Sequence, residues 1–286
     1  IVAALARTVR DDAASLQAYA KAVERLDVAL ACADLAVSLK MTRPQLRPFG
    51  RPVEIAGARL VPLEAHCAEH GLEYWPLTAR LDKPHALLHG SNMSGKSVVL
   101  KTVGALQILA QLGLFVPATR FATVVFERLF FIGPSGEQEA AGLSSFGREI
   151  VALQESLAAS GTGALFIVDE FARTTNSREA AALIAGLLSF FNGDRATYSL
   201  MATHYAGLPH FERVGRCRMR GLDWAKLRAG AAAGSPDGRD ERIQWINRCM
   251  AYEMVPDKGE AGSHDAIGIA EIDRKSTRLN SSHRIR

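Results

Sequence analysis

The sequence predicts an α/β fold in which a largely parallel β-sheet follows a helical N-terminal segment. Two apolar runs, ALFIVDE at residues 164–170 and SLMATH at residues 199–204, have the length and composition of buried strands. The stretch between them, EAAALIAGLLSFF, has helical length and spacing, and a strand, a helix and a strand form the unit from which parallel sheets are built. A third apolar run, HALLHG at residues 85–90, precedes another helical pattern, VVLKTVGALQILAQLG.

The first predicted element covers about residues 4–40 and is one long helix or a hairpin of two helices. Apolar residues recur there at helical spacing, and no Pro or Gly interrupts them. The following stretch, RPQLRPFGRPVEIAG at residues 43–57, holds three prolines and two glycines, which break a helical pattern. We therefore expect a helical segment at residues 1–42 and a separate domain at residues 43–272.

Two further stretches receive a local prediction. The run ARLVPL at residues 58–63 predicts a short strand, and AGAAAGSPDGRDE at residues 229–241 predicts a loop by its composition.

The composition is that of a globular chain, since 48% of its 286 residues are hydrophobic and the mean hydropathy is +0.03. No run approaches the roughly 18 apolar residues of a membrane span, and no leader pattern opens the chain. We therefore expect a cytoplasmic protein without a membrane partner. The four cysteines are far apart, and we find no clustered histidines that would complete a metal site with them.

Both ends of the chain have unusual features. Ile1 opens directly in a helical pattern, so we expect a cut there, and DRKSTRLNSSH at residues 273–283 resembles a sequencing adapter read as codons. We expect residues 273–286 to be non-native. This tail holds five of the 34 Lys and Arg residues and one of the 30 Asp and Glu residues, so the remaining chain has 29 of each. The pI of about 9.0 is therefore no evidence for nucleic-acid binding.

The stretch GSNMSGKS matches the phosphate-binding pattern G-x-x-x-x-G-K-[ST]. Its backbone N–H groups would approach phosphate oxygens at a helix N-terminus. Lys96 would reach the terminal phosphates, and the Ser97 hydroxyl would bind Mg²⁺. An ordinary glycine-rich turn is the alternative. The candidate nucleotide contacts in this stretch are Gly90, Ser91, Asn92, Met93, Ser94, Gly95, Lys96 and Ser97.

Three titratable residues end predicted strands. Asp169 and Glu170 close the ALFIVDE run, where Asp169 can hold the Mg²⁺ shell and Glu170 can orient or deprotonate an attacking water. Two carboxylates that end a strand in solvent are the alternative, which the phosphate-binding pattern upstream disfavours. His204 ends the next strand and could contact the γ-phosphate or the water, or it could be structural.

At five blocks, the sequence resembles the MutS family of ATPases. The blocks occur in the order that the family has: GSNMSGKS, QLGLFVPA, GLSSFGREI, ALFIVDE and MATHYAGL. The resemblance implies a P-loop NTPase with an ABC-like, MutS-type ATPase domain that uses ATP and Mg²⁺. It also implies that the opening helical segment corresponds to the end of the family's long lever segment.

The resemblance further implies a homodimer or a MutS-like heterodimer. Ser144, in GLSSF, corresponds to a signature that touches the nucleotide of the opposing subunit, and a Ser N-cap is the plain alternative. Tyr74, in EYWPL, falls near the aromatic residue that stacks on adenine in the family. Trp75 could serve instead, and a core role for Tyr74 fits equally well.

The chain departs from the mismatch-repair members at several points. DEFARTTNS has Ala172 and Thr174 where a Gly-Arg-Gly-Thr pattern is usual, and Ser91 stands where Pro is usual. The mismatch-reading and connector domains and the C-terminal helix-turn-helix are also outside this chain. DEFARTTN and SHDAIGIAEI more closely resemble a MutS-like branch, the ATPase of the lysine 5,6-aminomutase reactivase.

Three functions therefore remain open. The first is an ATPase that remodels a client enzyme, the cobalamin-dependent lysine 5,6-aminomutase. The alternative is a DNA mismatch-repair ATPase that acts on duplex DNA. A nucleotide-binding scaffold without turnover is disfavoured by the pair Asp169 and Glu170, because binding alone needs no carboxylate that orients water.

Overall fold

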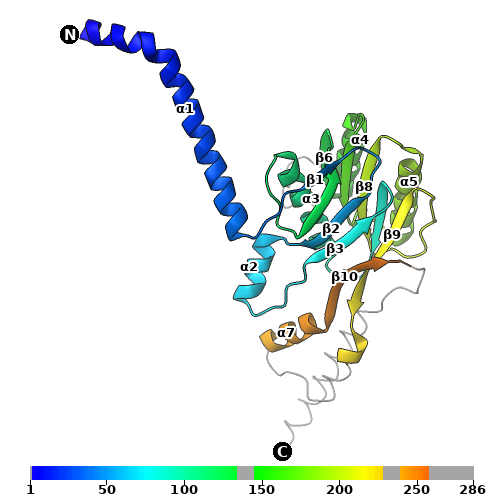
Figure 1. Cartoon of the computed structure of the whole chain (residues 1–286). Coiled ribbons are helices and arrows are strands. Elements are labelled where there is room, and N and C mark those ends of the chain that lie inside the picture. Colours follow the sequence, from blue (N-terminus) through cyan, green and yellow to red (C-terminus); the bar gives the residue numbers. More distant parts are fainter. Residues whose placement is uncertain (1, 134–144, 228–238, 258–286) are drawn as a thin grey trace, which may run out of the picture.

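The computed structural model describes residues 2–133, 145–227 and 239–257. These residues have the mixed α/β fold that the sequence predicts, with one sheet of six strands and one of four. A long N-terminal helix extends away from the sheets and the helices around them (Figure 1). Among the described helices, none has the length and apolar content needed to cross a membrane.

The N-terminal helix is α1, Val2–Ser38, and it is one continuous helix of 37 residues. No Pro or Gly lies within it, so nothing in its sequence breaks the backbone hydrogen bonds. Apolar side chains such as Leu16 and Tyr19 remain 52% and 69% exposed along its length. Among the residues of α1 whose burial is described, only Ala36, near the C-terminal end, is buried.

The six-stranded sheet has the order β10-β9-β4-β8-β7-β6. All neighbouring pairs among β4, β6, β7, β8 and β9 are parallel. The last strand, β10, is antiparallel to β9 and lies at one edge. The parallel sheet that the sequence predicts is thus present. The strands are β4 His85–His89, β6 Arg128–Ile132, β7 Ala164–Asp169, β8 Thr197–Thr203, β9 Val214–Leu222 and β10 Met250–Pro256.

Helices cover both faces of this sheet. On one face, α3, Lys96–Gln111, packs against Leu165 and Ile167 of β7. On the other face, α4, Ser145–Ala159, and α5, Ser177–Gly193, pack against Phe166 and Val168. Because successive side chains of a strand point to opposite faces, a strand covered on both sides needs an unbroken apolar run. The ALFIVD sequence of β7 supplies one.

The second sheet has the order β1-β5-β2-β3, which the sequence analysis did not predict. Two of its strands lie in the stretch with three prolines. The edge strand β1 has only three residues, and β2 follows Pro52 directly, so both avoid placing a proline in a central ladder. The strands are β1 Gln45–Arg47, β2 Val53–Ala58, β3 Leu77–Leu81 and β5 Arg120–Val124.

One local prediction was wrong, and a second was wrong at its C-terminal end. The strand expected at residues 58–63 is instead the end of β2 and the start of the helix α2, Val61–Glu69. Pro62 lies in the first turn of α2, where the missing N–H loses no helical hydrogen bond. Of the loop predicted at residues 229–241, the last three residues belong to α7, Arg239–Cys249, and the others lie outside the described residues.

Candidate functional site

The glycine-rich loop, residues 90–95, joins β4 to α3. Gly90 donates its N–H to the carbonyl oxygen of Thr203 at 3.2 Å, which ties the loop to the end of β8. A Cβ atom at Gly90 would lie 2.5 Å from Ser94 Oγ. Gly95 has φ +89° and would place a Cβ atom 3.0 Å from the ring of Tyr252. The loop therefore requires glycine at both positions, for close approach and for the left-handed backbone.

Lys96 is the first residue of α3, and it is only 3% exposed. Its Nζ donates to the carbonyl oxygens of Gly90 at 2.9 Å and Ser91 at 2.7 Å. It also lies 3.1 Å from Glu170 Oε1. Burial lowers the pKa of Lys96, whereas Glu170 and Asp169 act in the opposite direction. The loop thus encloses a cation whose nearest anion is one carboxylate.

The acidic pair lies where β7 ends. Asp169 is 4% exposed, and within the described residues its Oδ1 has no hydrogen-bond partner. Glu170 has φ +48°, and its N–H donates to the carbonyl oxygen of Ala202 at 3.2 Å. His204 Nδ1 lies 3.9 Å from Glu170 Oε1. The structure therefore brings Lys96, Asp169, Glu170 and His204 together at the carboxyl ends of neighbouring parallel strands.

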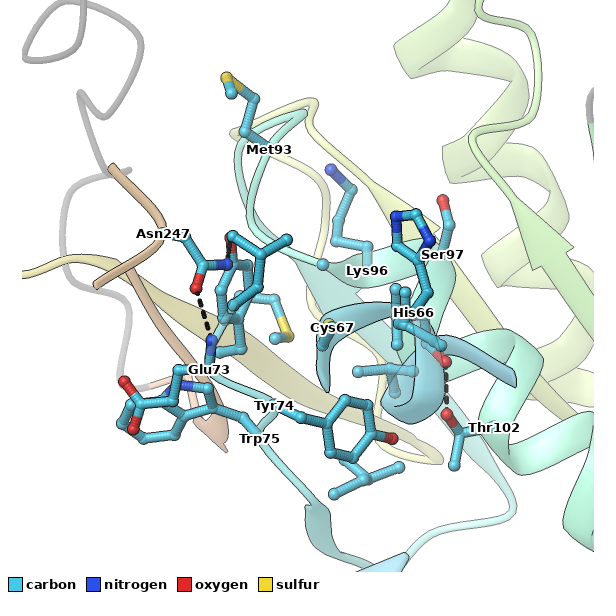
Figure 2. A pocket seen from close by; sticks show the side chains of 18 of the residues that line it. His66, Cys67, Glu73, Tyr74, Trp75, Met93, Lys96, Ser97, Thr102 and Asn247 are labelled. Atoms are coloured by element: carbon cyan, nitrogen blue, oxygen red, sulfur yellow. Dashed lines mark hydrogen bonds between the residues drawn. The ribbon is translucent and has the colours of Figure 1, made fainter. Parts of the chain in front are cut away.

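A cavity of about 390 Å³ lies beside the glycine-rich loop (Figure 2). A ligand pocket in a protein typically has a volume of about 300–1,000 Å³. Of the residues predicted to bind the nucleotide or Mg²⁺, those that line this cavity are Tyr74, Asn92, Met93, Gly95, Lys96 and Ser97. Gly90, Ser91 and Ser94 are not in its lining, and Ser94 is fully buried with its Oγ donating to the Ser91 carbonyl oxygen at 2.7 Å.

Tyr74 and Trp75 both line the cavity, so the structure leaves both as candidates for a stacking residue. The Tyr74 hydroxyl accepts a hydrogen bond from the Leu60 N–H at 2.6 Å, and burial raises the pKa of Tyr74. Trp75 Nε1 is buried and has no hydrogen-bond partner in the described part of the chain. A buried indole N–H without a partner is suited to donate a hydrogen bond to an acceptor atom of a ligand.

Several lining residues were not expected from the sequence. Among them, Tyr252 lies on β10, Asn247 on α7 and His66 on α2. Asn247 accepts a hydrogen bond from the Glu73 N–H at 3.2 Å, which is visible in Figure 2. No motif marks these residues, because they reach the cavity through long-range packing. The predicted residue Ser144 lies outside the described residues, and α4 begins at Ser145.

Comparison with known proteins places these residues in a family. Residues 86–221 match the model of MutS domain V. A DNA mismatch repair protein MutS of Natronomonas pharaonis is 31% identical over 244 residues, which are 80% of this chain and 28% of the relative. The MutS of Caulobacter vibrioides is 31% identical over 220 residues, which are 73% of this chain and 24% of the relative.

A third relative, the DNA mismatch repair protein MutS of Thermus thermophilus, is 30% identical over 202 residues, which are 71% of this chain and 24% of the relative. The chain thus spans only about a quarter of the length of these curated relatives. The matched residues 86–221 include the glycine-rich loop, Asp169, Glu170 and His204. The chain belongs to the MutS family, and the part that shows it is domain V.

Proposed function

We propose that this chain is a P-loop NTPase of the ABC-like, MutS type that binds ATP with Mg²⁺ and hydrolyses it. The observation that carries the proposal is the position of Lys96. Its ammonium is buried at the start of a helix, at the edge of a cavity, and is paired with one carboxylate, Glu170. A buried charge is costly unless it is paired. A buried lysine at the edge of a cavity is suited to bind an anionic ligand.

The phosphates of ATP would replace Glu170 as the counterion of Lys96. The backbone N–H groups at the N-terminus of α3 lie at the same place, and helix N-termini attract anions. The nucleoside would then occupy the cavity of about 390 Å³, with Tyr74 or Trp75 against the base.

Ser97 and Asp169 are the residues that would hold Mg²⁺. Asp169 Oδ1 is buried and lacks a hydrogen-bond partner among the described residues, which fits an oxygen that a cation or its bound water satisfies. Ser97 lines the cavity one residue after Lys96. When bound, Mg²⁺ would neutralise charge on the phosphates.

Glu170 and His204 would act on the attacking water. Glu170, once a phosphate has replaced it beside Lys96, would orient the water or accept its proton. His204 lies 3.9 Å from Glu170 and would contact the γ-phosphate or the same water. We also propose that ATP promotes a dimer in which Ser144 of one subunit faces the nucleotide of the other, which the GLSSF block supports.

We propose two alternative biological roles for the ATPase. The names of the relatives support DNA mismatch repair, and so an action on duplex DNA. Remodelling of a client enzyme such as lysine 5,6-aminomutase is supported by the residues DEFARTTN and SHDAIGIAEI alone. DNA binding distinguishes the two roles.

The test of ATP binding compares Lys96→Ala with Lys101→Ala. Lys101 lies on the same helix but is exposed, so it is a matched control for charge. We expect the wild-type chain and Lys101→Ala to bind Mg²⁺-ATP and release phosphate. Lys96→Ala should lose binding, because the phosphate charge is then uncompensated where the Lys96 ammonium stood.

Equilibrium binding of a fluorescent ATP analogue measures the affinity, and circular dichroism checks that each variant is folded. Lys96→Met retains most of the side-chain volume and should lose binding as well. Undiminished affinity in folded Lys96 variants, or no binding by the wild-type chain, would remove the phosphate site from residues 90–97.

A further inference from the structure

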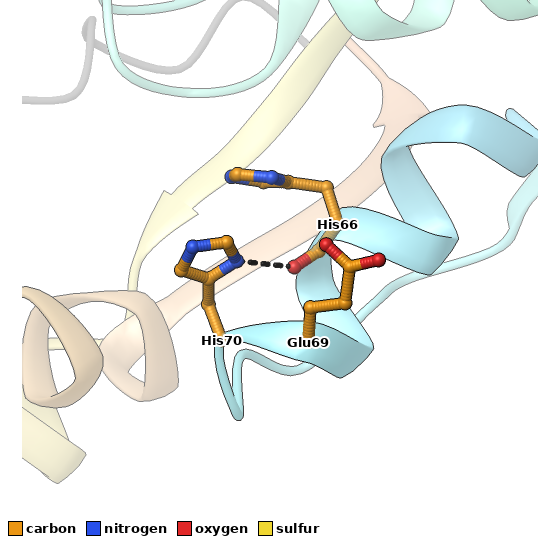
Figure 3. A group of neighbouring side chains, drawn as sticks. All are labelled: His66, Glu69 and His70. Carbon is orange, nitrogen blue, oxygen red and sulfur yellow. Dashed lines mark hydrogen bonds between the residues drawn. The ribbon is translucent and has the colours of Figure 1, made fainter.

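Three metal-ligating side chains lie together at the C-terminal end of α2 (Figure 3). His66 and Glu69 belong to the helix, and His70 is its C-cap. The sequence expectation concerned histidines that would complete a site with the cysteines, and this group contains no cysteine. Residues at positions i, i+3 and i+4 share one face of a helix. The cluster escaped notice because the helix itself was not predicted there.

We propose that His66, Glu69 and His70 form a binding site for a divalent transition-metal ion of the zinc type. The potential ligand atoms of the three residues all lie within 4.8 Å of one another. Tetrahedral Zn²⁺ with bonds of about 2.0–2.1 Å holds its ligand atoms about 3.4 Å apart. All three side chains are exposed, so they can make this small adjustment without loss of packing.

The hydrogen bond of His70 prepares its ring for metal binding. His70 Nδ1 lies 2.9 Å from the carbonyl oxygen of His66 (Figure 3). A carbonyl oxygen only accepts, so Nδ1 carries the proton and Nε2 keeps its lone pair. Metal-binding histidines commonly donate their second nitrogen to a carbonyl or a carboxylate in this way, which fixes the tautomer. The ring of His66 lies close by, at a centroid distance of 4.1 Å.

The surroundings favour a cation. Glu69 supplies a negative charge, and the site lies at the C-terminus of α2, where the carbonyl groups carry the negative end of the helix dipole. Cys67 lies next to His66 but is 7% exposed within the core. Because the three proposed ligand side chains are exposed and Cys67 is not, Cys67 does not join the site.

The ligand types determine which ion would bind. Two imidazoles and one carboxylate suit Zn²⁺ or Co²⁺, with a fourth position for water. Mg²⁺ prefers oxygen ligands in an octahedral shell, so it would not compete here. His66 also lines the cavity beside Lys96. A bound ion would therefore hold one wall of this cavity in place, without being part of the phosphate site.

The test is a titration of the full, metal-free chain with Zn²⁺ in competition with a chromophoric zinc indicator. We expect tight binding of one ion by the triad, that is, by His66, Glu69 and His70. His66→Ala, His70→Ala and Glu69→Gln should each weaken it at least about tenfold, because loss of even an outer-shell partner costs about 10–100-fold. His210→Ala is the matched control, since His210 is exposed but lies outside α2. It should retain wild-type affinity for the triad's ion.

Thermal unfolding of the metal-free variants checks their folding, and exposed substitutions should leave it nearly unchanged. Co²⁺ gives a second readout: we expect the visible spectrum of a tetrahedral site without a thiolate charge-transfer band. The proposal is wrong if the three triad variants bind Zn²⁺ as tightly as the wild-type chain, if Mg²⁺ displaces Zn²⁺ at equal concentration, or if a thiolate band appears.

Discussion

Lys96 Nζ lies 3.1 Å from Glu170 Oε1, and the two side chains are only 2% and 11% exposed. The pair connects the start of α3 with the end of β7. Desolvation of two buried charges offsets most of their attraction, so such a pair contributes little net stability. The pair matters for the proposed binding of ATP, because a phosphate that pairs with Lys96 would have to displace Glu170. Under the proposed function, Glu170 would therefore compete with ATP for Lys96 as well as serve as the catalytic base.

Glu170→Gln separates these two roles. The amide has no charge to compete for Lys96, and it cannot accept a proton from water. We expect the affinity for ATP to be retained or increased, while the hydrolysis rate falls by about 10²–10⁴-fold, the usual contribution of a general base. Phosphate release and equilibrium ATP binding measure the two effects.

The matched control is Glu155→Gln, because Glu155 is exposed on α4 and lies outside the cavity lining. This variant should behave as the wild-type chain does. Unchanged hydrolysis in Glu170→Gln would exclude Glu170 as the base. A weaker affinity for ATP would contradict the competition between Glu170 and the phosphates.

The elements around the glycine-rich loop could be predicted because their patterns are local. The strand β7 is almost entirely apolar, β4 and β8 each have an apolar centre, and α3 and α5 show clear helical spacing. The four-stranded sheet could not be predicted, because two of its strands lie among prolines. Their pairing depends on partners far along the chain, such as β2 with β5.

The candidate site divides in the same way. Lys96, Asp169, Glu170 and His204 follow or end strands of one parallel sheet, and the carboxyl ends of such strands meet at one edge. Their proximity could therefore be inferred from the sequence. Tyr252 and Asn247 come from the C-terminal part of the described chain. Only tertiary packing brings them to the cavity, so no local pattern could identify them.

Ala172 has φ +62° and is fully buried. It stands where mismatch-repair members of the family usually have Gly, and the left-handed backbone supplies a physical reason for that glycine. A left-handed conformation costs a residue with a Cβ atom about 1–2 kcal/mol. The greater backbone entropy of Gly in the unfolded chain cancels about 0.4–1 kcal/mol of this cost. We expect Ala172→Gly to raise the free energy of unfolding by up to about 1 kcal/mol.

Urea unfolding, followed by circular dichroism, measures the effect of Ala172→Gly. Ala180→Gly is the matched control, since Ala180 is equally buried but lies in α5. There, Gly should destabilise by about 1 kcal/mol or more. A loss of stability in Ala172→Gly as large as that in the control would show that the backbone at Ala172 is not strained.

His85 gives the fold a dependence on pH. Burial lowers the pKa of His85 from its ordinary value of 6.5 to about 4. Between these values the unfolded chain binds a proton that the folded chain does not, so the stability is complete above pH 6.5 and falls as the pH drops toward 4. Between pH 7 and pH 5, His85 should cost on the order of 2 kcal/mol of unfolding free energy.

The measurement is urea unfolding at pH 7 and pH 5 for the wild-type chain, His85→Gln and the exposed-site control His210→Gln. Glutamine does not titrate, and it can still bond to Ser199, whose Oγ lies 3.0 Å from His85 Nδ1. His85→Gln should lose stability at pH 7 but show a smaller difference between the two pH values. An equal difference in all three chains would mean that His85 is protonated in the folded state.

DNA binding by residues 1–272 should be weak and should not depend on a mismatch. The affinity of a protein for DNA comes largely from Lys and Arg side chains that neutralise phosphates and release counterions. Residues 1–272 contain 29 basic and 29 acidic residues, because the tail at 273–286 holds the excess. We expect a dissociation constant in the nonspecific range of about 10⁻⁴–10⁻⁶ M at physiological salt. Fluorescence anisotropy with matched and mismatched duplexes measures it.

The titration must be repeated at several salt concentrations, because a basic patch can exist within a neutral total charge. Its signature is a steep decrease of the affinity with salt, since each neutralised phosphate adds about 0.9 to the slope. The full chain is the comparison sample: its five basic tail residues should increase nonspecific binding without creating a preference. If residues 1–272 bind a mismatched duplex tightly, with a steep salt slope and a clear preference over matched DNA, repair replaces client remodelling as the better account of the ATPase.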